Sequence, residues 1–241
     1  MCCSTGEGAL LTLETLHADM DGTTLSADLS LLPGRRVAVL GPSGAGKSTL
    51  LDLLAGFRTP RSGRILWEGR DLTEVPPEKR PLSILFQDGN LFPHLDVGRN
   101  LGLALRPDGR RPGPGDTARI DEALRRVGLD GMAARKPGTL SGGQQSRAAL
   151  ARVLLMARPV LLLDEPFAAL GPGLKREMLA LVGEVGASLG ALTVMVTHDP
   201  GDARDFAEEV VLVADGTVHP PVATDAFFAA PPPAFRRYIG E

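Results

Sequence analysis

The stretch VAVLGPSGAGKSTLLDLLAG, Val37 to Gly56, decides how this chain folds. The apolar run Val37 to Leu40 predicts a short buried strand, and the apolar spacing of Leu50 to Ala55 predicts a helix that ends at Gly56. The glycine-rich loop between them fits the pattern G-x-x-x-x-G-K-[ST]. A strand, such a loop and a helix, in this order, predict a site that binds the phosphates of a nucleotide.

The residue types of this loop suit phosphate binding. Glycines allow backbone N–H groups to wrap around phosphate oxygens, Lys47 can reach the β- and γ-phosphates, and the Ser48 hydroxyl can be a ligand of Mg²⁺. A fortuitous glycine turn is the alternative, and the strand and helix that flank the loop disfavour it. The predicted nucleotide-binding residues are Gly41, Pro42, Ser43, Gly44, Ala45, Gly46, Lys47, Ser48 and Thr49.

Two carboxylates follow a second buried run, Val160 to Leu163. Because parallel strands end at one edge of a sheet, we expect Asp164 and Glu165 beside the phosphate loop. Asp164 is suited to hold Mg²⁺, and Glu165 could polarise the attacking water. His198 ends another apolar run and would contact the γ-phosphate. A solvated acidic turn and a structural histidine are the alternatives, which the nearby phosphate loop disfavours.

A second loop directed at anions precedes a helical pattern at 144–156 and consists of Leu140, Ser141, Gly142, Gly143 and Gln144. Its serine hydroxyl and its N–H groups form a helix N-terminus that favours negative charge. Because a helical segment lies between the two loops, we do not expect both to reach one nucleotide within one chain. The sequence therefore predicts a homodimer, paired head to tail, with two nucleotides between the chains.

The other patterns predict an α/β fold of a single domain. Buried parallel strands are predicted at 82–86, 160–163, 192–196 and 210–213, and an antiparallel β region at 9–13 and 25–32. Helical patterns dominate 88–157, which predicts an inserted α-helical subdomain within a nucleotide-binding core of 1–87 and 158–241. The Gly/Pro-rich tract at 106–115 is expected to be a solvated surface connection, with a recognition loop as the alternative. The chain should end in a short helix.

Composition and charge exclude several classes of protein. The 26 Lys and Arg nearly cancel the 29 Asp and Glu, so no basic field exists to bind nucleic acid. Cys2 and Cys3 have no distant partner thiol, which indicates a reducing compartment, and the first basic residue, Arg35, comes too late for a secretory signal. Met178 to Thr197 has the length of a membrane span, but its glycines favour a helix, a turn and a buried strand.

The motifs together resemble those of the ATP-binding cassette (ABC) superfamily, in the family's order and over practically the whole chain. The resemblance rests on a Walker A motif at 41–49, a Q-loop (LFQ) at 85–87, the signature LSGGQ at 140–144, a Walker B motif (VLLLDEP) at 160–166 and an H-loop (THD) at 197–199. It implies a P-loop NTPase fold that uses ATP and Mg²⁺, with Glu165 as catalytic glutamate. Gln87 would touch Mg²⁺ and report the nucleotide state to a membrane partner.

Two positions depart from the family's pattern. After Walker B the chain reads AALG at 168–171, so Gly171 stands where a carboxylate usually couples the two sites. The aromatic residue that usually stacks on adenine is also absent, and Met20 and His17 are the nearest candidates by position. Loss of stacking is expected to weaken ATP binding by about 1 kcal/mol.

Residues 75–105 and LLAGF at 53–57 look like the ATPases of bacterial thiamine importers. This resemblance implies an ATP hydrolase at the cytoplasmic face of the inner membrane, with an integral membrane permease and a periplasmic solute-binding protein as partners. Phe92, Pro93 and His94 would lie near the permease, and a hydrophobic turn that packs on the helical subdomain is the alternative. Two alternatives stay open: an importer of an inorganic anion, iron or polyamine, for which too few residues follow His198 to form the usual regulatory domain, and a soluble regulatory ABC ATPase.

Overall fold

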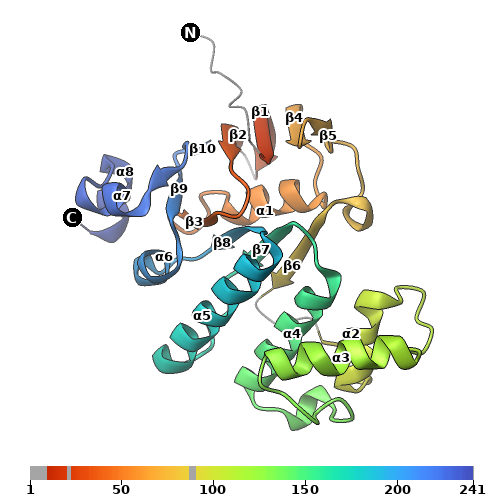
Figure 1. Ribbon diagram of the computed structural model, residues 1–241. Helices are drawn as coiled ribbons and strands as arrows, with labels where there is room; N and C mark the ends of the chain where they lie inside the picture. Colours follow the sequence, from red (N-terminus) through yellow and green to blue (C-terminus); the bar gives the residue numbers. More distant parts are fainter. Residues whose placement is uncertain (1–9, 21–22, 87–90, 241) are drawn as a thin grey trace.

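The computed structural model describes residues 10–20, 23–86 and 91–240. A curved mixed sheet runs through the molecule, with α1 (Lys47–Ala55) against one face and α5 (Pro172–Leu189) and α6 (Pro200–Phe206) against the other (Figure 1). The strand order is β5-β4-β1-β2-β10-β9-β3-β8-β7-β6, and β11 (Val222–Ala223) pairs with β9. The predicted α/β class is confirmed.

The parallel half of the sheet matches the predicted buried runs. It contains β3 (Arg36–Leu40), β6 (Leu82–Phe86), β7 (Val160–Asp164), β8 (Leu192–Val196) and β9 (Glu209–Ala214). Along β3, Val37 and Val39 face the core that contains α1, whereas Ala38 and Leu40 face the core that contains α5 and α6. Because side chains alternate along a strand, a continuous apolar run supplies both cores.

The antiparallel half of the sheet is more extensive than its sequence pattern predicts. It contains β1 (Leu11–Met20), β2 (Thr23–Leu31), β4 (Ser62–Trp67) and β5 (Arg70–Asp71). The pattern ends the first strand at Leu13, but β1 continues because Thr15, with φ 41°, lies in a register shift. Strict alternation after Leu13 would place Leu16 and Ala18 on the exposed face. The register shift at Thr15 places them on the buried face instead.

A short strand joins the two halves of the sheet. β10 (Thr217–Val218) is antiparallel to β9 and parallel to β2. The β1–β2 pair is thereby attached directly beside the parallel strands that carry the motifs.

Among the described residues between β6 and β7, three helices pack on one another: α2 (Val97–Leu105), α3 (Pro114–Arg126) and α4 (Gly142–Met156), of which α4 also packs against β6 (Figure 1). The sequence analysis did not identify α2, although Asp96 is its N-cap and accepts a hydrogen bond from the Arg99 N–H at 2.7 Å. The η1 (Pro77–Lys79) and η2 (Pro137–Thr139) turns are single 3₁₀ turns. The exact division into core and helical subdomain stays a prediction.

The stretch weighed above as a membrane span is a helix, a turn and a strand. Most of it is α5, which ends at Gly190 in the left-handed conformation (φ 59°), and the rest is the buried strand β8. Among residues 10–20, 23–86 and 91–240, no helix combines the length and the apolar character that a bilayer crossing requires.

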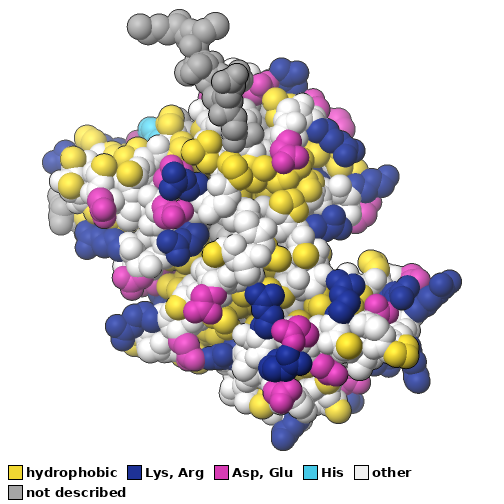
Figure 2. Space-filling view, viewed as in Figure 1, with side chains coloured by type: hydrophobic (Ala, Val, Ile, Leu, Met, Phe, Trp, Pro, Cys, Tyr) yellow, Lys and Arg dark blue, Asp and Glu magenta, His cyan; other side chains and the backbone are white. Residues whose placement is uncertain are grey.

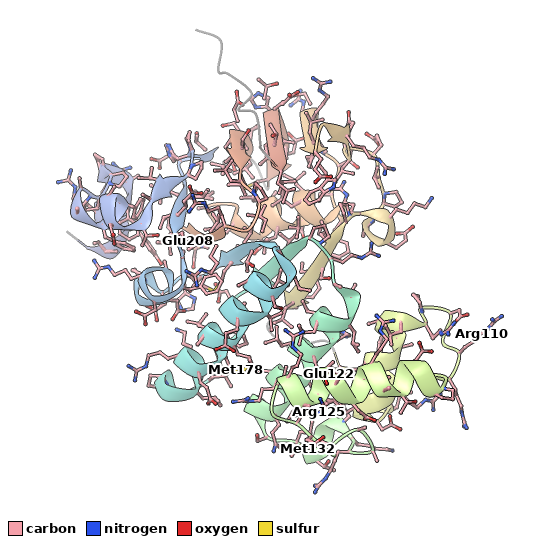
Figure 3. The ribbon with its side chains drawn as sticks, in the orientation of Figure 1. Arg110, Glu122, Arg125, Met132, Met178 and Glu208 are labelled. Atoms are coloured by element: carbon pink, nitrogen blue, oxygen red, sulfur yellow. The ribbon has the colours of Figure 1, made fainter. Side chains whose placement is uncertain are left out.

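Charges of both signs are interspersed on the face seen in Figure 2. On α3, Arg125 and Glu122 form an ion pair, and Arg110 extends from the connection between α2 and α3 (Figure 3). That connection is largely exposed, as its Gly/Pro content predicts.

Two short helices, α7 (Thr224–Ala229) and α8 (Pro233–Ile239), follow the sheet and pack beside β9. The second is the short final helix that the sequence predicts. Its Phe235 is almost fully buried.

Candidate nucleotide-binding site

The loop between β3 and α1 has a backbone that only glycine can adopt at two positions. Gly41 has φ 155°, and a Cβ atom there would lie 2.1 Å from the Val213 carbonyl oxygen. Gly46 has φ 103°, and its Cβ would lie 2.5 Å from the Met20 sulfur. The loop is thus packed closely against β9 and β1, and its shape is fixed by the fold.

Lys47 lies inside this loop. Its side-chain ammonium donates hydrogen bonds to the carbonyl oxygens of Gly41 at 2.7 Å and Pro42 at 2.9 Å. Burial lowers the pKa of Lys47, and the negative charges of Glu165 and Asp164 oppose that shift. Two of three ammonium donors are used within the loop, so one can be directed at a phosphate oxygen.

The two carboxylates of the Walker B motif lie at the end of β7, on the strand next to β8. Asp164 is half-buried, and desolvation raises its pKa, as does the charge of Glu165. Glu165 has φ 43°, a strained value for a residue with a side chain, and its N–H donates to the Val196 carbonyl at 3.1 Å. The backbone therefore turns sharply after Asp164, so that consecutive carboxylates take different positions.

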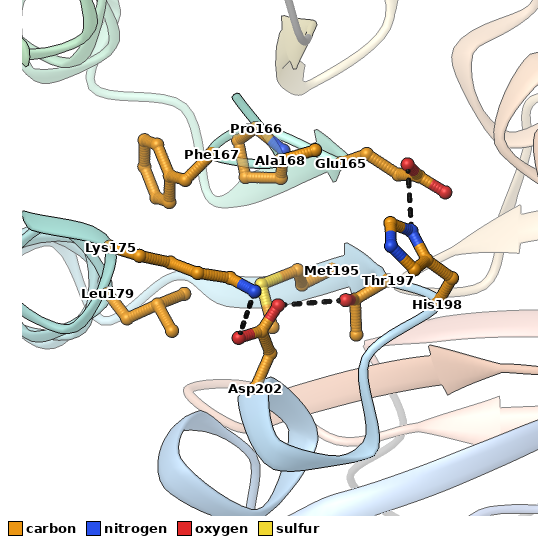
Figure 4. A pocket seen from close by; sticks show the side chains of 10 residues that line it. All are labelled: Glu165, Pro166, Phe167, Ala168, Lys175, Leu179, Met195, Thr197, His198 and Asp202. Atoms are coloured by element: carbon orange, nitrogen blue, oxygen red, sulfur yellow. Dashed lines mark hydrogen bonds and ion pairs between the residues drawn. The ribbon is translucent and has the colours of Figure 1, made fainter. Parts of the chain in front are cut away.

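His198 and Glu165, both expected beside the phosphate loop at the ends of buried strands, are in direct contact. The Nδ1 atom of His198 lies 3.0 Å from a carboxylate oxygen of Glu165 (Figure 4). The imidazole is more exposed than the carboxylate, with 59% against 31% of the side chain accessible. A histidine in this position can exchange a proton with Glu165 or present its other nitrogen to a ligand.

Behind this pair, charged side chains link three elements (Figure 4). Lys175 of α5 forms ion pairs with Asp199 at 2.9 Å and with Asp202 of α6 at 2.7 Å. Thr197, which follows β8, donates its hydroxyl to Asp202 at 3.0 Å. The start of α5 and the segment that carries His198 are thereby joined. Lys175 could not be recognised from the sequence, because nothing in its local pattern points to partners on α6.

A cleft opens in front of the phosphate loop. Its lining consists of Met20, Thr23, Ser43, Gly44, Gly46, Lys47, Ser48, Thr49, Arg58, Glu165 and Val196. Met20 lies on this wall, while His17 is three positions earlier on a regular part of β1 and points to the opposite face. Arg58, which the sequence analysis missed, donates to the Asp19 carbonyl at 3.1 Å and fills the wall beside Met20.

The signature loop lies elsewhere, at the N-terminus of α4. Ser141 accepts a hydrogen bond from the Gln144 N–H at 3.3 Å, and its own N–H donates to the Gln144 side chain at 3.0 Å. Ser141 and Gly142 are exposed, and Gly143 packs against Leu174 of α5. None of residues 140–144, all of them described, lines the cleft of the phosphate loop.

Gln87 and Gly171 are two further positions that the sequence pattern singles out. Gln87 lies outside the described residues, but Phe86 before it is paired with Asp164 across β6 and β7. Gly171 is the N-cap of α5 with φ −65°, and an added Cβ would meet nothing within 4 Å. The backbone at 171 therefore does not require glycine.

Comparisons with known proteins agree with this geometry. The family model described as ABC transporter matches residues 25–168. The thiamine import ATP-binding protein ThiQ of Cereibacter sphaeroides is 60% identical over 96% of this chain and all of its own length. ThiQ of a Ruegeria species is 53% identical over the same shares.

Solved structures show the same fold. MJ1267, an ATP-binding cassette of an ABC transporter in its ADP conformation, has a TM-score of 0.86 at 22% identity and covers 98% of this chain and all of its own. CbiO1 of Clostridium perfringens, part of the CbiONQ transporter complex, has a TM-score of 0.81 at 28% identity over 97% of this chain and 95% of its own. The chain therefore belongs to the ABC transporter family, as one of its ATP-binding cassettes.

Proposed function

We propose that this chain hydrolyses ATP to power the import of thiamine or thiamine phosphates across a bacterial inner membrane. The observation that carries the ATPase part is the contact of Glu165 with His198 at the edge of a phosphate loop. The solute rests on the resemblance at 53–57 and 75–105 and on the ThiQ relatives at 60% and 53% identity.

The phosphate loop binds and orients the triphosphate. Backbone N–H groups at the start of α1 and the Lys47 ammonium hold the β- and γ-phosphates, while the helix N-terminus favours their charge. Met20 and Arg58 of the cleft wall contact the adenine in place of the usual aromatic residue, through sulfur contact and stacking of the guanidinium.

The donor chemistry at this site fits Mg²⁺. Ser48 lines the cleft with a hydroxyl, and Asp164 supplies a carboxylate whose charge acts on the neighbouring Lys47; both side chains offer oxygen ligands. Mg²⁺ usually takes one or two carboxylates together with phosphates and water, so a dedicated protein cage is not required. Ser48, Asp164 and Gln87 would hold the ion, which neutralises phosphate charge when bound.

Glu165 acts on the attacking water. Its carboxylate orients and polarises a water molecule for in-line attack on the γ-phosphorus. His198 holds Glu165 through Nδ1 and contacts the γ-phosphate with its other ring nitrogen, Nε2. The Lys175 ion pairs keep the backbone beside His198 in place.

The second nucleotide-facing loop acts on a second copy. Because Ser141 and Gly142 are exposed and do not line this chain's own cleft, two chains pair head to tail and each signature loop closes the partner's site. The ATPase dimer sits on the cytoplasmic face of the membrane, against an integral permease that receives solute from a periplasmic binding protein.

Uptake measurements test the solute. Deletion of the gene in a strain without a second importer should abolish concentrative uptake of labelled thiamine, and the wild-type gene should restore growth at low thiamine. Lys47→Ala, expressed to the same level, should not restore it. Unchanged uptake in the deletion strain would refute thiamine as the solute. Loss of uptake of an anion, iron or polyamine would identify another importer, and an ATPase recovered free of membranes would favour a soluble regulator.

A further inference from the structure

The hydroxyl of Tyr238 holds the main chain of His198. Its oxygen donates a hydrogen bond to the His198 carbonyl at 2.6 Å. The contact joins α8 to the segment between β8 and α6, forty positions earlier in the chain. Tyr238 thus contacts the backbone of His198, whereas Glu165 contacts its imidazole ring.

The position of Tyr238 is fixed by a packed aromatic cluster. Phe235, one turn earlier on α8, is 1% exposed, and its ring lies 4.8 Å from that of Phe227 and 5.8 Å from that of Tyr238. Arg237, which directly precedes Tyr238 on α8, forms an ion pair with Asp215 at 3.0 Å. The helix is thus docked independently of the tyrosine hydroxyl.

The backbone around His198 depends on contacts of this kind. Residues 197–199 belong to no helix or strand, and the imidazole is largely exposed. Thr197 and Asp199 are tied to the Lys175 network on one side, and the Tyr238 hydroxyl binds the carbonyl between them. Burial and the charges of Glu165 and Asp199 raise the pKa of Tyr238, which keeps the hydroxyl protonated as a donor.

We propose that Tyr238 is a positioning residue for ATP hydrolysis: it fixes the backbone of His198 so that the imidazole meets both Glu165 and the γ-phosphate. This inference rests on the role proposed above for His198. It makes α8, which carries none of the sequence motifs, part of the hydrolytic machinery.

Tyr238→Phe removes the hydroxyl and keeps the ring that packs on Phe235. In the full chain, kcat for ATP hydrolysis should fall about three- to tenfold, as expected for loss of one hydrogen bond, while KM for ATP and Tm stay unchanged. Arg237→Ala is the matched control, because it removes an exposed ion pair of the same helix, leaves the aromatic packing in place and does not touch His198; it should leave kcat unchanged. A wild-type kcat in Tyr238→Phe, or an equal loss in Arg237→Ala, would overturn the proposal.

A double-mutant cycle separates this inference from the proposed site. His198→Ala alone should be strongly impaired, and adding Tyr238→Phe should cause no further loss, because the hydroxyl acts through the imidazole. A further loss of the same factor would show that Tyr238 acts elsewhere and would overturn the inference alone. Wild-type hydrolysis by His198→Ala would instead refute the role of His198, and the inference with it.

Discussion

The phosphate loop and the signature loop are both glycine-rich helix starts, yet the chain treats them differently. The phosphate loop is enclosed: Lys47 is buried, Gly41 and Gly46 touch neighbouring strands, and Glu165 stands at its edge. The signature loop is presented to solvent at Ser141 and Gly142, and the Ser141 hydroxyl takes part in the capping box of α4. Both could bind an anion, but only the first is surrounded by groups that can react with it.

The two loops therefore have different partners. The phosphate loop is surrounded by binding groups of its own chain and can bind nucleotide without a partner. The signature loop is exposed and can contact a nucleotide only when a second chain brings one to it. Four substitutions test this contrast, in order of decreasing expected effect.

Glu165→Gln should lower ATP hydrolysis about 100-fold or more while ATP binding persists, because only the carboxylate that polarises water is lost. An ATP-stabilised dimer should accumulate, which gel filtration can detect. Glu184→Gln, at an exposed position of α5, is the matched control and should hydrolyse normally. Hydrolysis by Glu165→Gln at the wild-type rate would remove Glu165 from the mechanism.

Ser141→Arg should abolish the ATP-dependent dimer and reduce hydrolysis about tenfold or more, because the side chain enters the space where the partner's γ-phosphate docks. ATP affinity of the monomer should change less than about twofold. Ala118→Arg, exposed on α3, controls for added bulk and charge in the helical region. Normal dimerisation of Ser141→Arg with ATP would contradict the head-to-tail arrangement.

Lys47→Ala should weaken ATP binding about tenfold, since the charge that faces the β- and γ-phosphates is lost. Equilibrium binding of a fluorescent ATP analogue measures the effect, and the exposed Lys79→Ala is the control. Equal affinities of the two variants would show that the buried ammonium does not face the triphosphate.

Asp164→Asn should raise Tm at neutral pH by about 2 °C, because burial raises the pKa of Asp164 and an ionised carboxylate there opposes folding. A carboxyl group whose pKa is higher in the folded than in the unfolded protein destabilises the fold. The full destabilisation applies at pH values above the folded-state pKa, and it vanishes at pH values below the ordinary pKa of about 4. The gain in Tm should therefore shrink as the pH falls. Asp130→Asn, at an exposed position after α3, is the control and should show no such trend. A gain in the Tm of Asp164→Asn that persists at acid pH would exclude the electrostatic explanation.

Most of the site follows from local sequence. The parallel strands are continuous apolar runs, and the motif residues follow their ends. Because parallel strands end at one edge of a sheet, Lys47, Glu165 and His198 could be expected at the same edge. Arg58, Lys175 and Tyr238 could not be predicted, because each acts through a partner far along the chain. The extension of β1 past Leu13 was also missed, since the irregularity at Thr15 interrupts the alternation that marks a strand.

Cross-linking between two cysteine variants of the chain is the most direct test of whether the phosphate loop of one chain meets the signature loop of the other in a dimer. In a background of Cys2→Ser, Cys3→Ser and Glu165→Gln, one chain would carry Ser43→Cys and the other Ser141→Cys, both at exposed positions. With ATP and a short bifunctional thiol reagent, mixed chains should form a cross-linked dimer, whereas Ser43→Cys alone and mixtures without ATP should not. A cross-link between two Ser43→Cys chains, with none in the mixture, would contradict the head-to-tail site.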